Sequence, residues 1–297
     1  MTTLACGYAT EGQGVTPLAA ALECGALSDQ GFQATLVKLG DAHAVAAAMA
    51  SGEIALGNLA APGLVDAVAK GADLVFIAGG VNQQFLVGAP GATLASVAGQ
   101  PLGASRQADL TDFLVQLTMS EVLNTPSEVR FVGGSKPRVR ALLDGTVAAT
   151  PLSPPVAIEA RQAGCPWLYD YSEMGLNFAI GGIAVARAFL NAQPELVKRV
   201  LRAYLEGQRR YKSDREFGIS IHEKYGEVSR QVAEETYDVT HDGFRDTPDP
   251  ATDGMGKLIA FWQQAGTLPA DFTLDRVADP SLVIAVCGER DLWGSGS

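Results

Sequence analysis

The chain has 297 residues, enough to bury a substantial core as one large domain or as two smaller ones. Its 22 basic and 33 acidic residues give a formal charge of −11, and its strongest basic patch is only Arg209-Arg210-Tyr211-Lys212, so the composition argues against nucleic acid as a partner. No stretch approaches the roughly 20 apolar residues of a membrane span, and we expect a soluble globular protein.

Short β-type runs alternate with helical runs from residue 3 to about residue 171, a pattern typical of parallel sheets flanked by helices. The expected strands are residues 4–8, 34–39, 54–56, 74–77, 101–104, 129–132, 147–149 and 167–170. The expected helices between them are 16–27, 42–51, 61–70, 109–123, 136–144 and 154–163. The fold class is therefore α/β.

A faint internal repeat suggests two similar halves. A shift of 93 residues places 40–71 on 133–164 without a gap, and the identical pairs include Gly40/Gly133, Gly52/Gly145 and Gly71/Gly164. Any two units of strand, turn and helix share some glycine and proline positions at their turns and helix ends, but the gapless register indicates two related lobes.

Long helical stretches dominate after about residue 187, at 187–191, 194–210, 214–225, 227–242 and 251–265. A chain that runs through one lobe, then the other, and returns as helices packing on the first would cross twice, with 84–88 and 178–185 as crossover candidates. We expect lobe one to comprise 1–83 and 187–297, and lobe two 84–186.

Cysteine and histidine spacing indicates no metal site or redox pair, and no cofactor is expected. Cys6, Cys24, Cys165 and Cys287 lie far apart with no CxxC spacing, and their disulfide status stays open. The three histidines are too scattered to suggest a metal centre.

A ligand of an open parallel sheet binds beyond the carboxyl ends of the strands, where helix N-termini offer unpaired N–H groups. The loops that follow the expected strands are 9–13, 57–60, 80–83, 105–109 and 150–153, which are polar and mostly uncharged. The candidate ligand-binding residues are Tyr8, Thr10, Glu11, Asn58, Asn82, Gln83, Ser105, Arg106, Gln107, Thr150, Ser153, Asn177 and Phe178.

Arg106 is the most informative candidate, because its guanidinium could pair with a carboxylate or sulfonate beside a helix N-terminus. An exposed loop arginine is an equally good interpretation. Asn58 and Asn82 could instead cap helices or shape turns, and Tyr8 and Phe178 could belong to the core. The repeat places Thr150 and Ser153 opposite Gly57 and Ala60, in matching loops of the two lobes.

Four segments, taken in order, resemble the nitrate/sulfonate/taurine family of type II periplasmic solute-binding proteins, which includes binders of thiamine-pyrimidine precursors. They are Leu18–Gly25 followed by Gly31-Phe32, Met49–Ala55, Leu142–Ala149, and Ala188–Leu190 followed by Gln193–Tyr204. Family members usually carry Asp where this chain has Glu53 and Thr146.

The resemblance implies a two-lobed type II periplasmic-binding-protein-like fold with two crossover strands, and a helical C-terminal region packed on lobe one. It also implies lobes that close over a ligand, an ABC transporter permease as partner and a periplasmic location. Arg106 and the helix N-termini favour a small organic anion as that ligand, such as a sulfonate, carboxylate or heteroaromatic acid, and we expect a monomer. The run Leu4–Tyr8 lacks the features of a signal peptide, and residues 294–297 read like a tag linker. Either an export signal was removed or the protein is cytoplasmic.

An enzyme on the same scaffold, such as a decarboxylase, lyase or hydrolase, is the alternative, and a regulatory binding module comes third. The candidate catalytic groups by type are Glu11, Asp109 and His241, although a helix charge or an ordinary surface or core histidine explains Glu11 and His241 better. Because no catalytic motif accompanies them, we favour the binding protein.

Overall fold

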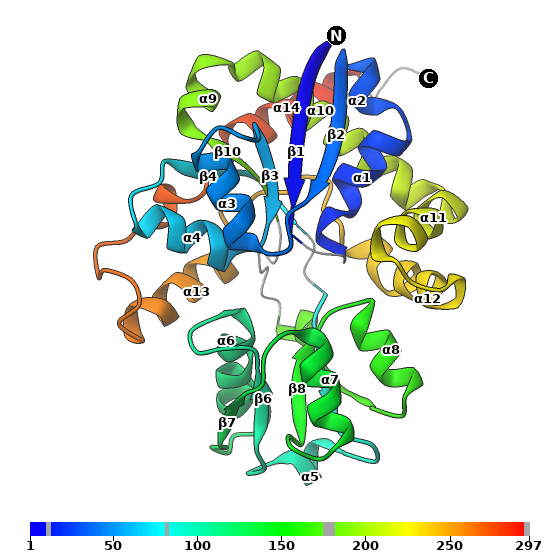
Figure 1. Cartoon of the computed structure of the whole chain (residues 1–297), viewed down its shortest axis with the longest axis vertical. Coiled ribbons are helices and arrows are strands. Elements are labelled where there is room, and N and C mark those ends of the chain that lie inside the picture. The colour runs from blue at the N-terminus through cyan, green and yellow to red at the C-terminus, as the bar shows by residue number, and fades with distance from the viewer. Residues whose placement is uncertain (10–12, 81–82, 175–181, 294–297) are drawn as a thin grey trace. The chain divides into compact units, whose positions relative to one another are not determined.

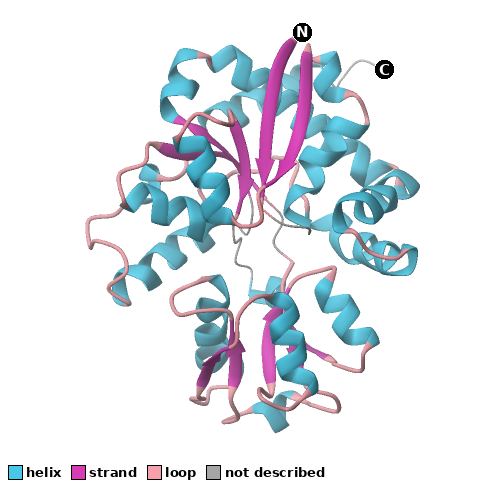
Figure 2. Ribbon diagram, viewed as in Figure 1, coloured by secondary structure: helices cyan, strands magenta, loops and turns pink. Residues whose placement is uncertain are grey.

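The computed structural model describes residues 1–9, 13–80, 83–174 and 182–293, with side chains up to residue 289. The chain forms two compact units, each with its own five-stranded sheet and surrounding helices (Figure 2). The first unit comprises Met1–Asn82, Asn177–Ile259 and Leu268–Ser297, and the second comprises Gln83–Leu176 and Ala260–Thr267. The expected α/β class and two-lobed organisation are confirmed.

The first sheet has the strand order β2-β1-β3-β10-β4, in which β10 is antiparallel to both neighbours. Its strands are β1 (Thr2–Tyr8), β2 (Phe32–Lys38), β3 (Leu56–Leu59), β4 (Leu74–Gly79) and β10 (Gly182–Ala186). Four short helices flank it: α1 (Thr16–Glu23), α2 (Ala26–Asp29), α3 (Ala42–Ala50) and α4 (Ala61–Ala69).

The C-terminal helices complete the first unit (Figure 1). They are α9 (Arg187–Ala192), α10 (Pro194–Ser213), α11 (Arg215–Gly226), α12 (Arg230–Thr240), α13 (Asp253–Gln264) and α14 (Ser281–Trp293), although the end of α13 belongs to the second unit. One apolar cluster joins the sheet residues Leu4 and Ile77 to Leu18 of α1, Leu201 of α10 and Val283 of α14. The expected packing of helical C-terminal residues on lobe one is therefore confirmed.

The second sheet has the order β7-β6-β8-β5-β9, with β5 antiparallel between β8 and β9. Its strands are β5 (Phe85–Gly88), β6 (Leu102–Ala104), β7 (Val129–Phe131), β8 (Ala149–Leu152) and β9 (Trp167–Asp170). Its helices are α5 (Leu94–Val97), α6 (Leu110–Leu117) continued by a π-helical turn at Thr118–Val122, α7 (Ser135–Leu143) and α8 (Val156–Gln162). None of the helices in the described part of the chain is long and apolar enough to cross a membrane.

The internal repeat is structural. Helices α3 and α7, and strands β3 and β8, have bounds that differ by the same 93 residues that the sequence shift gives. The paired glycines also share their backbone conformation, since φ is 93° at Gly40 and 95° at Gly133. Both sheets place an antiparallel strand fourth in the order.

The predicted boundaries 1–83, 84–186 and 187–297 differ from the units in three places. Gln83 belongs to the second unit. Strand β10 pairs with β3 and β4, so it belongs to the first sheet and not to the second lobe. Residues Ala260–Thr267 return to the second unit. The expected strands 54–56 and 147–149 lie too early, since β3 and β8 run at 56–59 and 149–152, and the sequence patterns did not indicate α5 or α14.

Candidate functional site

The parallel strands β6, β7 and β8 of the second unit end at the same edge of their sheet, as the parallel register requires. The residues that follow them are Ser105–Asp109, then 132–134, then 153–155. We call these three segments the β6–β8 edge. It contains Ser105, Arg106, Gln107 and Ser153, four of the residues that the sequence analysis selected.

Asp109 organises the first of these loops as the N-cap of α6. Its Oδ1 accepts hydrogen bonds from the backbone N–H of Thr111 at 2.9 Å and of Asp112 at 3.0 Å, and from the Thr111 hydroxyl at 2.8 Å. Its Oδ2 accepts the Ser105 hydroxyl. An internal carboxylate thus already occupies the helix terminus that the sequence analysis offered to a ligand anion.

Within the loop, Arg106 and Gln107 are exposed while Ser105, Ala108 and Asp109 are half-buried. The Ser105 N–H donates to the Thr111 hydroxyl at 2.8 Å, which ties the start of the loop to α6. Arg106 therefore projects from a loop whose backbone is held at both ends. A guanidinium on a fixed loop can pair with a carboxylate or sulfonate.

Arg138 is a charged residue beside this edge that the sequence analysis missed. It lies in the first turn of α7 and is only 5 % exposed, and its Nη1 donates to Gly133 O at 3.0 Å and its Nη2 to the Ser135 hydroxyl at 3.4 Å. Burial lowers the pKa of its guanidinium to about 10, and the nearby Asp109 carboxylate opposes that shift. The guanidinium stays charged at neutral pH and offsets the charge of Asp109.

The other candidates of the second unit are less accessible. Thr150 lies inside β8 with no exposed surface, and its hydroxyl donates to Gly103 O at 2.7 Å, so its expected place in a loop is wrong. Gln83 donates to Asp170 at 2.8 Å. Ser153 is half-buried just beyond β8.

Two candidates of the first unit are mostly buried. Tyr8, at the end of β1, is 9 % exposed and packs in an apolar cluster with Ala19 and Tyr211, which favours the core interpretation. Asn58 lies within β3 and not in a loop, and its side-chain amide donates to Gly14 O at 3.0 Å and to Gly182 O at 3.5 Å. Asn58 therefore links three segments of the unit and caps no helix. Thr10, Glu11, Asn82, Asn177 and Phe178 lie outside the described residues.

The enzyme candidates show structural roles where they are described. The Asp109 carboxylate caps α6, as above. The His241 ring stacks on Tyr237 with centroids 4.9 Å apart, and its Nδ1 lies 3.1 Å from Tyr237 O, in the helical part of the first unit. Glu11 lies outside the described residues.

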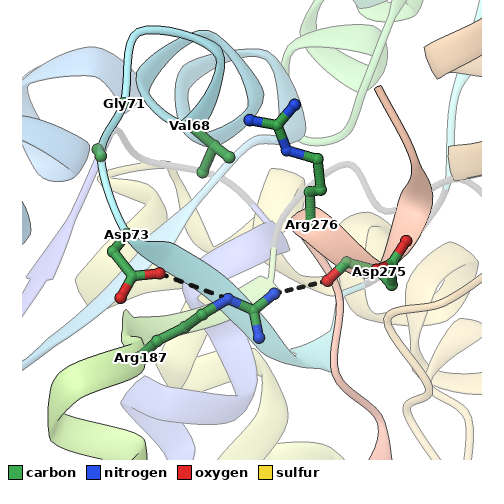
Figure 3. Close-up of a pocket in the computed structure, with 7 residues that line it drawn as sticks. Val68, Gly71, Asp73, Arg187, Asp275 and Arg276 are labelled. Carbon is green, nitrogen blue, oxygen red and sulfur yellow. Dashed lines mark hydrogen bonds and ion pairs between the residues drawn. The ribbon is translucent and has the colours of Figure 1, made fainter. Parts of the chain in front are cut away.

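An open pocket of about 430 Å³ lies elsewhere on the first unit, where β4 begins and β10 ends (Figure 3). Arg187 is held by two contacts there, since its Nε lies 3.6 Å from the Asp73 carboxylate and its Nη2 donates to the backbone carbonyl oxygen of Asp275 at 2.6 Å. Because the pocket lies where β4 begins, it is at the opposite end of that strand from the carboxyl edge at which parallel sheets bind ligands.

The model of the NMT1/THI5 like family matches residues 13–214, which is more than half of the chain. The ligand binding component of an ABC-type import system from Staphylococcus aureus, solved with zinc bound, is similar in structure, with a TM-score of 0.79 and 16 % identity over 96 % of this chain and 99 % of that one. The periplasmic aliphatic sulphonate binding protein of Escherichia coli has a TM-score of 0.76 and 17 % identity, over 94 % of this chain and 92 % of that one. The periplasmic nitrate-binding protein of Synechocystis PCC 6803 has a TM-score of 0.74 and 13 % identity, over 98 % of this chain and 90 % of that one. No curated protein matches the sequence.

Proposed function

Because the chain belongs to the NMT1/THI5 like family, we propose that it is a solute-binding protein that takes a small organic anion as the solute-binding component of an ABC importer. The proposal includes an extracytoplasmic location, a permease as partner and a monomeric state. The neighbours described as a component of an import system and as periplasmic binders of sulphonate and nitrate support it.

The observation that most supports an anionic ligand is the exposed Arg106 on the loop between β6 and α6. Hydrogen bonds to Thr111 and Asp112 fix the backbone of that loop, so the guanidinium starts from a defined anchor. Its charge is added to an edge where buried Arg138 already offsets Asp109. Ser105 and Ser153, both half-buried, add hydroxyl groups at the same edge.

The enzyme alternative has less support. Asp109 spends both carboxylate oxygens on hydrogen bonds within its own loop and helix, so it is poorly placed to exchange protons with a substrate. His241 is stacked on Tyr237 in the helical part of the first unit. Binding without chemical conversion is therefore the better proposal.

A thermal-shift panel of nitrate, alkylsulfonates, aromatic carboxylates and Zn²⁺ tests the function. We expect a sulfonate or carboxylate to raise the melting temperature and to be recovered intact by mass spectrometry. Its dissociation constant, measured by calorimetry, should rise about tenfold or more in Arg106→Gln, because a charge-assisted hydrogen bond is lost.

Arg140→Gln is the matched control, since Arg140 is another exposed arginine of the second unit, on α7. It removes the same charge and should leave the affinity nearly unchanged. Equal weakening by both variants, or a panel without an anionic hit, contradicts the anion proposal. Recovery of a converted compound contradicts the binding-protein proposal itself.

A further inference from the structure

Ala108, in the loop between β6 and α6, has a left-handed backbone with φ of 55°. Residues with a Cβ rarely adopt this conformation, and it persists only where the surroundings hold it. Both peptide groups of Ala108 are held. Its N–H donates to Asp112 Oδ2 at 2.7 Å, and its carbonyl oxygen accepts the indole N–H of Trp262 at 2.6 Å.

The two contacts differ in origin. Asp112 is four residues away and belongs to the same loop and helix, whereas Trp262 is 154 residues away and comes from the end of α13. Trp262 is 3 % exposed, and both Trp262 and Ala108 belong to the second unit. The carbonyl side of the left-handed residue is thus fixed by a segment that returns from the distant C-terminal part of the chain.

The end of α13 is built to present Trp262 in one orientation. Gly266 has φ of 70°, its N–H donates to Gln263 O at 3.0 Å, and the N–H of Thr267 donates to Trp262 O at 2.9 Å, the bonding pattern of a Schellman C-cap. The Thr267 hydroxyl also donates to Trp262 O at 2.9 Å. These hydrogen bonds fix the backbone of Trp262 independently of the contact that its indole makes with the loop.

An aromatic contact keeps the same segment against α6. The ring centroids of Phe261 and Phe113 lie 5.3 Å apart at an interplanar angle of 51°. Phe113 lies one residue after Asp112, whose carboxylate holds the other side of Ala108. The segment therefore makes one polar contact with the loop, at Ala108, and one apolar contact with the helix that follows it, at Phe113.

We propose that Trp262 is a positioning residue that sets the conformation of the Ser105–Asp109 loop. Its indole N–H holds Ala108 left-handed, and this turn places Arg106 and Gln107 on the exposed side while Asp109 remains the cap of α6. The loop's role in taking the solute rests on the proposed function. Its conformational dependence on Trp262 does not.

Hydrogen exchange of the intact protein, followed by mass spectrometry of the peptide 103–113, tests this without a solute. Trp262→Phe keeps an aromatic ring and removes the N–H donor. We expect exchange of the loop amides to rise about fivefold or more, the factor that one ordinary hydrogen bond supplies.

Adding Ala108→Gly to the Trp262→Phe protein should restore the slow exchange of the loop amides. Glycine adopts a positive φ without a Cβ clash, so the loop needs the indole less, and exchange should return toward the wild-type rate. A tryptophan that only fills space would gain nothing from this second change.

Trp167→Phe is the matched control, because the Trp167 indole also donates to a backbone carbonyl of the second unit, Ala157 O at 2.8 Å, outside the loop. It should leave peptide 103–113 at the wild-type rate. Unchanged loop exchange in Trp262→Phe, an equal rise in the peptide 135–143, or failure of Ala108→Gly to rescue would each overturn the proposal. Failure of the anion panel would leave these results standing, so the two proposals fail separately.

Discussion

The buried side chains of Tyr211, His222 and Thr240 make a hydrogen-bonded chain across α10, α11 and α12. Thr240 donates its hydroxyl to Thr236 O at 2.7 Å, so the Tyr211 hydroxyl, 2.9 Å away, donates to Thr240. Tyr211 must then accept from His222 Nε2, at 2.7 Å. His222 therefore carries a proton on Nε2, and its burial favours the neutral ring over the imidazolium, so replacing it tests this charge state.

The structure also gives the size of the effect. Burial lowers the pKa of His222 from 6.5 to about 4. In the unfolded chain the imidazole binds a proton as the pH falls through about 6.5, whereas the folded protein resists until about pH 4. Stability is therefore lost as the pH falls, by about 2 kcal/mol between pH 7.5 and pH 5 and by about 3 kcal/mol in total below pH 4.

Urea denaturation of wild type and His222→Gln at pH 7.5 and pH 5 measures this loss. Glutamine keeps an N–H donor for Tyr211 and does not titrate, so the variant should lose about 2 kcal/mol less between the two pH values. His43 and His241 are present in both proteins and cancel in the comparison. An equal loss in both proteins would refute the neutral, buried assignment.

Two further predictions concern close packing and thiol chemistry. A Cβ on Gly207 of α10 would clash with the backbone nitrogen of Ala21 in α1, so Gly207→Ala should destabilise the protein by about 2 kcal/mol or more in urea denaturation. Gly288, an exposed helical glycine, is the control, because no atom lies within 4 Å of a Cβ added there, and Gly288→Ala should stabilise the protein by about 0.5–1 kcal/mol. Equal changes in stability in the two variants would contradict the close contact between Gly207 and Ala21. Cys6 has no exposed surface and burial raises the pKa of its thiol to about 12, so iodoacetamide at pH 8 should leave it unlabelled in the native protein while partly exposed Cys24 reacts; equal labelling, read by mass spectrometry, would contradict this.

The sequence predicted most strands and helices because their apolar periodicity is local, but it placed β3 and β8 two residues too early. Gly57 and Asn58 look like loop residues. A Cβ on Gly57, however, would lie 2.7 Å from Met49 and from Val45 of α3, so this glycine lets a helix pack closely on a strand. Local patterns do not distinguish that role from a turn.

The candidate site was predictable in part for the same reason. The loop 105–109 is predictable because it lies between an apolar strand pattern and a helix pattern, and Asp109 is a recognisable N-cap. Arg138 left a weaker signal, since it shares a buried helical face with Ala141 and Leu142, at spacings of three and four residues. Trp262 left none near Ala108, because 154 residues of chain separate them.

The position of Asp109 changes how an anion could be held at the β6–β8 edge. The sequence analysis joined Arg106 and the α6 terminus into one anion site, but the carboxylate of Asp109 already accepts the N–H groups of Thr111 and Asp112. A solute carboxylate at that terminus would compete with an internal one. The attraction that we propose would then come from the exposed guanidinium of Arg106, because the buried guanidinium of Arg138 already offsets the Asp109 carboxylate. Salt screens an exposed charge strongly, so the affinity for an anion should fall as ionic strength rises.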